Sequence, residues 1–139
     1  MSKGFTEQDL TSQKGKTFVI TGANTGLGYE AARALCSKGA RVLIACRSEH
    51  KASDAIARIR ALHSQAELDY VPLDLGSLAS VKDCAQQLQK EEKIDVLINN
   101  AGIMVPPYEL TTDGFESQFG VNHLGPFALT SLLLDTLSK

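Results

Sequence analysis

Three glycines fall within seven residues in the stretch TGANTGLGYEAARAL (residues 21–35), which follows an apolar run and continues into good helix formers. Inside regular structure a glycine costs about 0.5–1 kcal/mol relative to alanine, because it loses more backbone freedom on folding. Glycines clustered between a strand and a helix therefore indicate that another group approaches the backbone closely. The alternative is a tight turn that binds no ligand.

Four short apolar runs alternate with amphipathic segments along the chain. The runs predict buried strands at residues 17–21, 41–46, 68–73 and 95–99. Apolar side chains at helical spacing predict a helix after each of the first three strands. The predicted buried faces are Leu27, Ala31, Ala34 and Leu35, then Ala52, Ile56, Ile59 and Leu62, and then Leu78, Val81, Ala85 and Leu88.

A last helix should follow the fourth strand. Asp113 and Glu116 resemble a capping box, although Ser or Thr is the usual first residue, and the helix would run to about residue 137. Alternating strands and helices predict an α/β fold with a parallel sheet. Right-handed crossovers then give a Rossmann-like, doubly wound sheet with helices on both faces and strand order 3-2-1-4, truncated after the helix that follows strand 4. Such sheets bind ligands outside the carboxyl ends of the strands, at a topological switch point.

Composition and charge exclude several classes of protein. The 139 residues suffice for one domain, and 43% apolar with 22% charged residues is ordinary for a globular protein. With a net charge of −2 and no basic stripe, we expect no nucleic-acid partner. No apolar run approaches the ~20 residues of a membrane span, and residues 1–11 do not resemble a signal or transit peptide. We expect a polar extension at 1–14 and a single domain at 15–139.

The cysteines and histidines do not suggest a metal or disulfide site. Cys36, Cys46 and Cys84 form no CxxC pair, and their odd count argues against a disulfide framework. We expect each to be a small buried side chain in a reducing compartment, which favours a cytoplasmic location. The histidines are scattered along the chain, at 50, 63 and 123, so no metal site is expected.

The glycine cluster has the features of an anion-binding turn. Gly22 would allow the tight turn, Gly26 would let a pyrophosphate approach the backbone, and Gly28 would let the helix pack close to the sheet. The unpaired N–H groups and partial positive charge of a helix N-terminus attract phosphates. The spacing GxxxGxG differs from the common GxGxxG dinucleotide fingerprint, so the spacing alone is a weak signal.

Four motifs in order carry a family resemblance. They are TGANTGLG at residues 21–28, DL at 74–75, NNAG at 99–102 and VNHLGPF at 121–127. Together they resemble the short-chain dehydrogenase/reductases, and they are most similar to the retinol-dehydrogenase-like branch. The resemblance covers nearly the whole chain beyond the first dozen residues. It implies an oxidoreductase that transfers a hydride between a nicotinamide cofactor and a small-molecule substrate, an alcohol or a carbonyl compound. The expected cofactor-binding residues are Gly22, Asn24, Thr25, Gly26, Leu27, Gly28, Arg47, Ser48, Asp74, Leu75, Asn100, Ala101 and Gly102.

The segment after the second strand favours NADP(H) over NAD(H). Enzymes that use NAD place an acid there for the adenosine ribose, whereas this sequence has Ala45-Cys46-Arg47-Ser48 and no acid before Glu49. The guanidinium of Arg47 can clamp a 2′-phosphate. A charge-assisted hydrogen bond contributes roughly 1.5–3 kcal/mol, or about ten- to hundredfold in affinity. The domain at 15–139 is then an incomplete NADP-binding domain. The alternative is that Arg47 is a solvated loop charge.

Asp74 and the NNAG motif would complete the cofactor site. The resemblance implies that Asp74 contacts the adenine amino group; the alternative is a cap for a helix that begins near Ser77. Small residues at 101 and 102 let the cofactor's sugar lie close to the backbone. Asn99 and Asn100 can bridge backbone groups of neighbouring strands, so we expect structural and binding roles together.

Asn122 is the catalytic residue expected in this chain. The resemblance implies that it distorts its helix and that its main-chain carbonyl holds a water in the proton relay. Pro126, four residues later, has no N–H to donate to that carbonyl, so we predict that the carbonyl is free. The alternative is a surface kink without catalytic meaning.

The family's acid/base pair does not occur in these residues. The resemblance implies a serine and a Tyr-x-x-x-Lys pair after the Asn122 helix, but the tyrosines at 29, 70 and 108 are followed four residues later by Arg33, Asp74 and Thr112. We therefore expect the N-terminal part of a longer enzyme, inactive as given. The alternatives are a non-catalytic NADP(H)-binding or redox-sensing module and a fragment with no function of its own.

Only the class of substrate, an alcohol or carbonyl compound, is expected, because the substrate pocket would lie mainly outside these residues. Met104 and Tyr108 follow the fourth strand. Packing within the loop is their expected role, and the edge of a substrate cleft is the alternative.

Two features predict self-association. The fourth strand would lie at an edge of the sheet, where an apolar strand is open to pairing. The last helix is rich in leucine between residues 129 and 137. We therefore expect a homo-oligomer, or a chain that is marginally stable by itself.

Overall fold

The four apolar runs form the strands of one parallel sheet. In the computed structural model, which describes residues 4–139, the strands are β1 (Thr17–Thr21), β2 (Arg41–Cys46), β3 (Glu67–Pro72) and β4 (Val96–Ile98). They pair in the order β3-β2-β1-β4, and every pairing is parallel, which confirms the predicted order. β1 and β2 have their predicted bounds, β3 begins one residue earlier, and β4 is two residues shorter.

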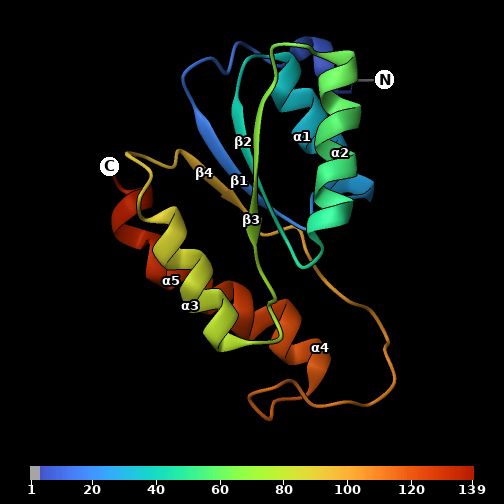
Figure 1. The fold of residues 1–139 in the computed structure, drawn as a ribbon, viewed down its shortest axis with the longest axis vertical. Coiled ribbons are helices and arrows are strands. Elements are labelled where there is room, and N and C mark those ends of the chain that lie inside the picture. Colours follow the sequence, from blue (N-terminus) through green and yellow to red (C-terminus); the bar gives the residue numbers. More distant parts are fainter. Residues whose placement is uncertain (1–3) are drawn as a thin grey trace.

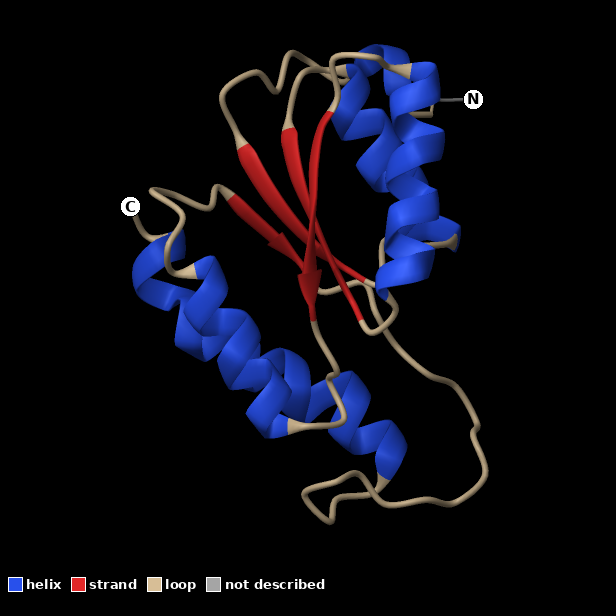
Figure 2. Ribbon diagram, in the orientation of Figure 1, coloured by secondary structure: helices blue, strands red, loops and turns tan. Residues whose placement is uncertain are grey.

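Helices cover both faces of the sheet, as Figure 1 and Figure 2 show. α1 (Gly26–Ser37) and α2 (Glu49–Leu62) lie on one face, and α3 (Leu78–Leu88) and α5 (Gly125–Leu137) lie on the other. This arrangement confirms the predicted doubly wound, Rossmann-like fold. Among the residues that the structure describes, no helix is both long and apolar enough to cross a bilayer.

Alternate side chains of each strand enter two separate cores. Phe18 and Ile20 of β1 pack into the core beneath α1 and α2, whereas Val19 between them packs into the core beneath α3 and α5. A strand buried on both faces needs an apolar residue at nearly every position. β1 and β2, which are buried at all but their first residue, were therefore recognisable in the sequence as continuous apolar runs.

The predicted buried faces of α1 and α2 are partly wrong. Leu27 is 84% exposed. Gly28 fixes the rotation of α1, because it faces the sheet so closely that a Cβ there would lie 2.4 Å from Nδ2 of Asn100. Apolar periodicity does not mark a glycine as a buried position, so it did not predict that Gly28 faces the sheet. In α2 the predicted Leu62 is exposed, and Ala55 is buried instead. The buried residues of α1 are Gly28, Tyr29, Ala32, Leu35 and Cys36.

The last predicted helix is interrupted rather than continuous. It consists of α4 (Ser117–Phe119), a π-helical turn η2 (Gly120–Leu124) and α5. In η2 the amide of Gly125 donates to the carbonyl of Gly120, five residues back. Single π-turns of this kind are frequent at functional sites.

The predicted capping box is also wrong. Glu116 is the N-cap of α4: its carboxylate accepts hydrogen bonds from the amides of Gln118 and Phe119, each at 2.8 Å. These backbone hydrogen bonds lower the pKa of Glu116. Asp113 instead accepts the Leu78 amide at 2.8 Å, so it satisfies a backbone donor at the start of α3. The spacing identified the right carboxylates but paired one of them with the wrong helix.

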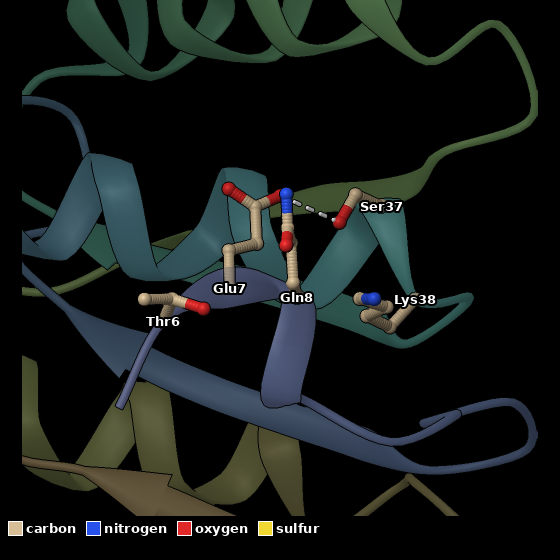
Figure 3. A pocket seen from close by; sticks show the side chains of 5 residues that line it. All are labelled: Thr6, Glu7, Gln8, Ser37 and Lys38. Atoms are coloured by element: carbon tan, nitrogen blue, oxygen red, sulfur yellow. Dashed lines mark hydrogen bonds between the residues drawn. The ribbon is translucent and has the colours of Figure 1, made fainter. Parts of the chain in front are cut away.

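The described part of the N-terminal extension packs against the end of α1. A short 3₁₀ turn, η1 (Glu7–Asp9), places Glu7 beside Arg33. The Arg33 guanidinium donates to the two carboxylate oxygens at 3.2 and 2.8 Å, and Ser37 Oγ donates to one of them at 2.9 Å. Residues 1–3 of the predicted extension lie outside the described residues. A hollow of about 580 Å³ lies at this junction. Figure 3 shows the side chains that line it, which are Thr6, Glu7, Gln8, Ser37 and Lys38.

Asp95 ties the start of β4 to the start of β1, and this link predicts a pH dependence. Its carboxylate accepts the Thr17 amide at 2.9 Å and lies 2.8 Å from Nζ of Lys93. The hydrogen bond from Lys93 and then that from Thr17 lower the pKa of Asp95. Asp95→Asn should lower the free energy of unfolding at neutral pH by about 1 kcal/mol, the difference between a charge-assisted and a neutral hydrogen bond.

The pH profile of this effect follows from the sign of the shift. A carboxylate whose pKa is lowered by folding stabilises the protein above its unfolded pKa, about 3.9 for Asp, and loses that effect as the pH falls through the folded value. The difference between the wild type and Asp95→Asn should therefore be constant near neutrality and shrink below about pH 4. Urea unfolding at several pH values measures it, and a difference that does not change with pH would count against this account.

Candidate functional site

A cavity of about 700 Å³ lies at the carboxyl ends of the strands. Its volume is within the range of small-molecule sites, and its position is that in which open α/β sheets bind ligands. Segments that follow all four strands contribute to its wall. Of the predicted cofactor-binding residues, Gly26 and Gly28 are not in the wall. Those that line the cavity are Gly22, Asn24, Thr25, Leu27, Arg47, Ser48, Asp74, Leu75, Asn100, Ala101 and Gly102.

The cavity is also lined by residues that the sequence patterns did not indicate. Lys51, in the first turn of α2, follows the helix N-cap Ser48 by three residues, and this capping signal could have placed it beside Arg47. The others belong to strand ends, to the long loop between β4 and α4, or to the elements after that loop. That loop has no hydrophobic periodicity, so no pattern places its residues. These others are Ala45, Cys46, Leu73, Gly76, Ile103, Pro106, Glu109, Leu110, Thr111, Thr112, Ser117 and Val121.

Gly22 turns the chain out of β1 into the cavity wall. Its φ of +68° lies in the left-handed region, which residues with a side chain adopt only with strain. A Cβ at this position would lie 3.0 Å from Cα of Ala101. The Gly22 amide donates to the carbonyl of Ala45 at 2.8 Å. The tight turn predicted for Gly22 is therefore present, and the segment that follows β4 limits the space beside it.

The two glycines at the start of α1 differ in the space around them: Gly28 is closely packed and Gly26 is not. A Cβ at Gly28 would lie 2.9 Å from the carbonyl oxygen of Gly22, so Gly28 has the packing role that was predicted. Gly26 has a φ of +59°, and no atom lies within 4 Å of its Cβ position. The N-cap residue Thr25 makes no side-chain hydrogen bond to the first turn. The first amides of a helix have no intrahelical partner, and here the cap side chain does not occupy them.

Thr21 holds the NNAG segment against the end of β1. The side chain of Thr21 is fully buried, and its hydroxyl accepts hydrogen bonds from the amides of Asn100 and Ala101, each at 3.0 Å. Nδ2 of Asn100 donates to the Thr21 carbonyl at 2.9 Å. Asn99 donates to Oγ1 of Thr130 in α5 at 3.1 Å. The predicted bridging of backbone groups between strands is confirmed for Asn100. It is wrong for Asn99, whose side chain binds a hydroxyl of α5 and not a strand backbone.

The junction of β2 and α2 is positively charged. Ser48 caps α2 by accepting the Lys51 amide at 3.3 Å. Arg47 is exposed and, in the described part of the chain, neither Arg47 nor Lys51 forms an ion pair. Cys46, which also lines the cavity, is a free buried thiol, as are the other two cysteines. Burial raises the pKa of Cys46, so the thiol adds no negative charge to this junction near neutral pH.

Asp74 shapes the loop after β3 but does not cap α3. Its Oδ1 accepts the Gly76 amide at 2.9 Å, and its own amide donates to Oγ of Ser80 at 2.9 Å. The N-cap of α3 is Ser77, whose side chain accepts the Ser80 amide at 3.3 Å. The alternative assignment of Asp74 as a helix cap is therefore wrong.

Asn122 connects η2 to the loop after β4 through its side chain. Its Nδ2 donates to the carbonyl of Ile103 at 2.7 Å, and its Oδ1 accepts the Ile103 amide at 2.8 Å. The predicted distortion of the helix at Asn122 is present as the π-turn. Pro126 follows at the start of α5 and has no N–H for the Asn122 carbonyl. That this carbonyl is free stays a prediction.

Removing the Asn122 amide should destabilise the chain. Asn122→Ala removes both hydrogen bonds to Ile103, and each such bond contributes about 0.5–1.5 kcal/mol. We expect the free energy of unfolding, measured in urea, to fall by about 1–3 kcal/mol. Asn99→Ala, which removes the single bond to Thr130, is the matched control and should cost less. Equal effects of the two substitutions would contradict the two-bond arrangement.

Met104 and Tyr108 do not have the packing role expected of them. They are 87% and 80% exposed, and neither lines the cavity, to which Ile103 and Pro106 of the same loop contribute. Between them, the Val105 amide donates to Oε1 of Gln118 at 2.7 Å.

Comparison with known sequences identifies related proteins. The family model described as short chain dehydrogenase matches residues 16–139. The chain is 52% identical over 126 residues to retinol dehydrogenase 12 of Mus musculus, covering 90% of this chain and 40% of that protein. It is 48% identical over 124 residues to retinol dehydrogenase 13 of Homo sapiens, covering 88% and 38%. The chain thus spans about two fifths of the length of these curated relatives.

Solved structures share the fold. An uncharacterised protein of Mycobacterium paratuberculosis has 48% sequence identity and a TM-score of 0.84, covering 96% of this chain and 47% of that one. A Pseudomonas aeruginosa structure described as the RhlG/NADP active-site complex has 29% identity and a TM-score of 0.75, covering 90% and 47%.

Proposed function

We propose that this chain, which belongs to the short-chain dehydrogenase family, holds NADP(H) in the cavity at the carboxyl ends of its strands. The main support for this proposal comes from the junction of β1 and α1, where the N-terminus of α1 lies at the cavity. The side chain of its N-cap residue, Thr25, accepts no hydrogen bond from the first amides of the helix. We propose further that the whole protein is an oxidoreductase. It would transfer a hydride between NADP(H) and an alcohol or carbonyl substrate.

The residues at the cavity suit the parts of a dinucleotide. The diphosphate would lie at the N-terminus of α1, where the space beside Gly26 is empty and helix amides attract phosphate oxygens. Following the family resemblance, Asp74 would contact the adenine amino group, with Leu75 beside it. Ala101 and Gly102 are small enough for a ribose to lie against their backbone. The bound cofactor would supply or accept the hydride.

The β2–α2 junction supports a preference for NADP(H) over NAD(H). The cavity residues Ala45, Cys46, Arg47 and Ser48 include no carboxylate that would repel a 2′-phosphate, and Arg47 can bind one through its guanidinium. The Pseudomonas aeruginosa relative is described as an NADP complex, which supports the same assignment here.

Asn122 is the residue of this chain that we place in catalysis. Its side chain is held by Ile103, which leaves its main-chain carbonyl as the group proposed to hold a water of the proton relay. No Tyr-x-x-x-Lys pair occurs in the sequence, so we propose that these residues alone do not turn over substrate. The chain's own contribution would be to hold the cofactor and one member of the relay.

Calorimetric titration of the chain tests the proposal. We expect NADPH to bind saturably at one site and NADH to bind about ten- to hundredfold more weakly, because NADH lacks the phosphate that Arg47 would contact. Nicotinamide mononucleotide, which lacks the adenosine half, is the matched weak ligand. The absence of saturable binding of both dinucleotides by a folded chain would overturn the proposal.

We also propose that the isolated chain self-associates. β4 lies at the edge of the sheet, Val96 is 36% exposed, and Leu132 and Leu134 of α5 are 42% and 58% exposed. We expect the average mass in sedimentation equilibrium to rise above the 14.9 kDa of one chain as concentration increases. Val96→Lys should reduce this association, because a charged edge resists pairing. A constant monomer mass with a sharp thermal transition would contradict it.

A further inference from the structure

We infer that Gln118 is a positioning residue, whose side chain holds the loop segment 103–106 in the shape that completes the cavity wall after the NNAG motif. The inference rests on the proposed function, because the shape of this wall matters only if a nucleotide binds within it. Gln118 itself is not in the wall. Its effect on a bound nucleotide therefore has to pass through the backbone of the segment.

The segment contains a strained residue, Val105. Its φ is +48°, and of the residues that the structure describes it alone combines a side chain with a positive φ. A branched side chain adopts this left-handed region only with strain, and a residue before a proline, here Pro106, prefers extended backbone. The Val105 side chain is 83% exposed, so packing does not hold the conformation. Strained residues persist where other contacts hold them, and they gather at functional sites.

Two amide side chains on one helical face hold this segment. Oε1 of Gln118 accepts the Val105 amide at 2.7 Å. Asn122 accepts the Ile103 amide at 2.8 Å and donates to the Ile103 carbonyl at 2.7 Å. Gln118 belongs to α4 and Asn122 to η2, and residues four apart in a helix lie side by side. Asn122 thus fixes the start of the segment, and the Gln118 bond acts on the strained residue itself.

The shape of the segment decides which of its residues reach the cavity. Ile103 and Pro106 line the cavity, whereas Met104 and Val105 do not. If the Gln118 bond is lost, the strain at Val105 and the preference of a residue before proline both favour a return to a negative φ. The chain beyond Val105 would then change direction, and Pro106 would leave the wall. Gln118 therefore maintains a conformation that Val105 would not adopt by itself.

The test measures the dissociation constant of NADPH by calorimetry in variants of the folded chain. Gln118→Ala should weaken binding about three- to tenfold, the equivalent of one neutral hydrogen bond, because fewer chains then present the complete wall. Gln89→Ala is the matched control, since it also removes one side-chain hydrogen bond to a backbone group. That bond runs from Nε2 of Gln89 to the Leu132 carbonyl at 2.7 Å and lies outside the cavity wall. The control should leave the constant unchanged.

A substitution of the strained residue separates positioning from a general loss of stability. Asparagine adopts a positive φ more readily than valine, so Val105→Asn alone should bind NADPH as tightly as the wild type. Combined with Gln118→Ala, it should restore the dissociation constant to within about twofold of the wild-type value, because residue 105 then needs less help to keep its conformation. The double variant also tests the inference if Gln118→Ala by itself does not fold.

The conformation of residue 105 can be observed directly. A positive φ brings the amide and α protons of one residue closer together than a negative φ does, so the nuclear Overhauser effect between them should weaken in Gln118→Ala and return in the double variant. If Gln118→Ala leaves the NADPH constant unchanged, or the double variant does not recover it, the inference is wrong even though the chain binds NADPH. If the wild-type chain binds no NADPH, the proposed function itself fails, which is a different result.

Discussion

Replacing Gly28 with alanine is expected to destabilise the chain by about 2 kcal/mol, since overpacking of a close contact costs about 1–3 kcal/mol. The new Cβ would lie 2.4 Å from Nδ2 of Asn100 and 2.9 Å from the carbonyl oxygen of Gly22. The Asn100 side chain is held in place, because its Nδ2 already donates to the Thr21 carbonyl at 2.9 Å. The variant should also lose nucleotide binding, since α1 would be pushed away from the sheet. Urea unfolding and calorimetry measure the two effects.

Gly26→Ala is the matched comparison, because it should weaken NADPH binding without crowding any neighbouring atom of the fold. No atom lies within 4 Å of the Cβ position of Gly26, so the cost to stability is that of its positive φ, about 1–2 kcal/mol. The added methyl group would instead occupy the space proposed for the diphosphate and weaken NADPH binding. If Gly28→Ala proved no more destabilising than Gly26→Ala, the close packing of α1 on the sheet could not be the reason for the glycine.

Replacing Thr21 with valine is expected to cost about 1–3 kcal/mol of stability, the cost of one unsatisfied donor. The side chain keeps its shape, but the Ala101 amide loses its acceptor, whereas the Asn100 amide keeps its hydrogen bond to the Ile98 carbonyl at 3.0 Å. Since Thr21 is fully buried, water cannot replace the hydroxyl at its own position. The NNAG segment should also lose its fixed position, so NADPH binding is expected to weaken with stability.

Thr21→Ser separates the hydroxyl from the methyl group. Serine keeps the acceptor for Asn100 and Ala101 and loses one methyl group, which costs about 1 kcal/mol. We therefore expect Thr21→Ser to keep most of its stability and its nucleotide binding. A serine variant as unstable as the valine variant would show that packing, and not the hydrogen bonds, makes Thr21 necessary.

The sheet and the position of the cavity at the carboxyl ends of its strands could be predicted, because both follow from the sequences of single segments. Strands covered on both faces need apolar residues at every position, and parallel strands bring their carboxyl ends to one edge. The glycine turn after β1 and the NNAG segment after β4 therefore had to meet, and Thr21 and Asn100 are the contact between them. The family resemblance read from these motifs is confirmed by the match over residues 16–139.

The features that sequence reasoning missed depend on contacts between distant segments. The rotation of α1 is set by the approach of Gly28 to Asn100, which apolar periodicity does not contain. Asp113 binds the Leu78 amide, 35 residues away in the sequence, and not the nearby helix that its spacing suggested. The place of Lys51 in the cavity wall follows from the Ser48 cap, a local signal that was present and was overlooked.

Amide chemical shifts of the isotope-labelled chain, recorded during titration with NADPH, test most directly whether this cavity is a dinucleotide site. The saturable changes should concentrate at residues 22–28, 47–51, 74–76 and 100–103, and Gly26→Ala should weaken the binding that produces them. A folded chain whose shifts do not respond to NADPH, or respond only around the hollow beside Glu7, would contradict the assignment.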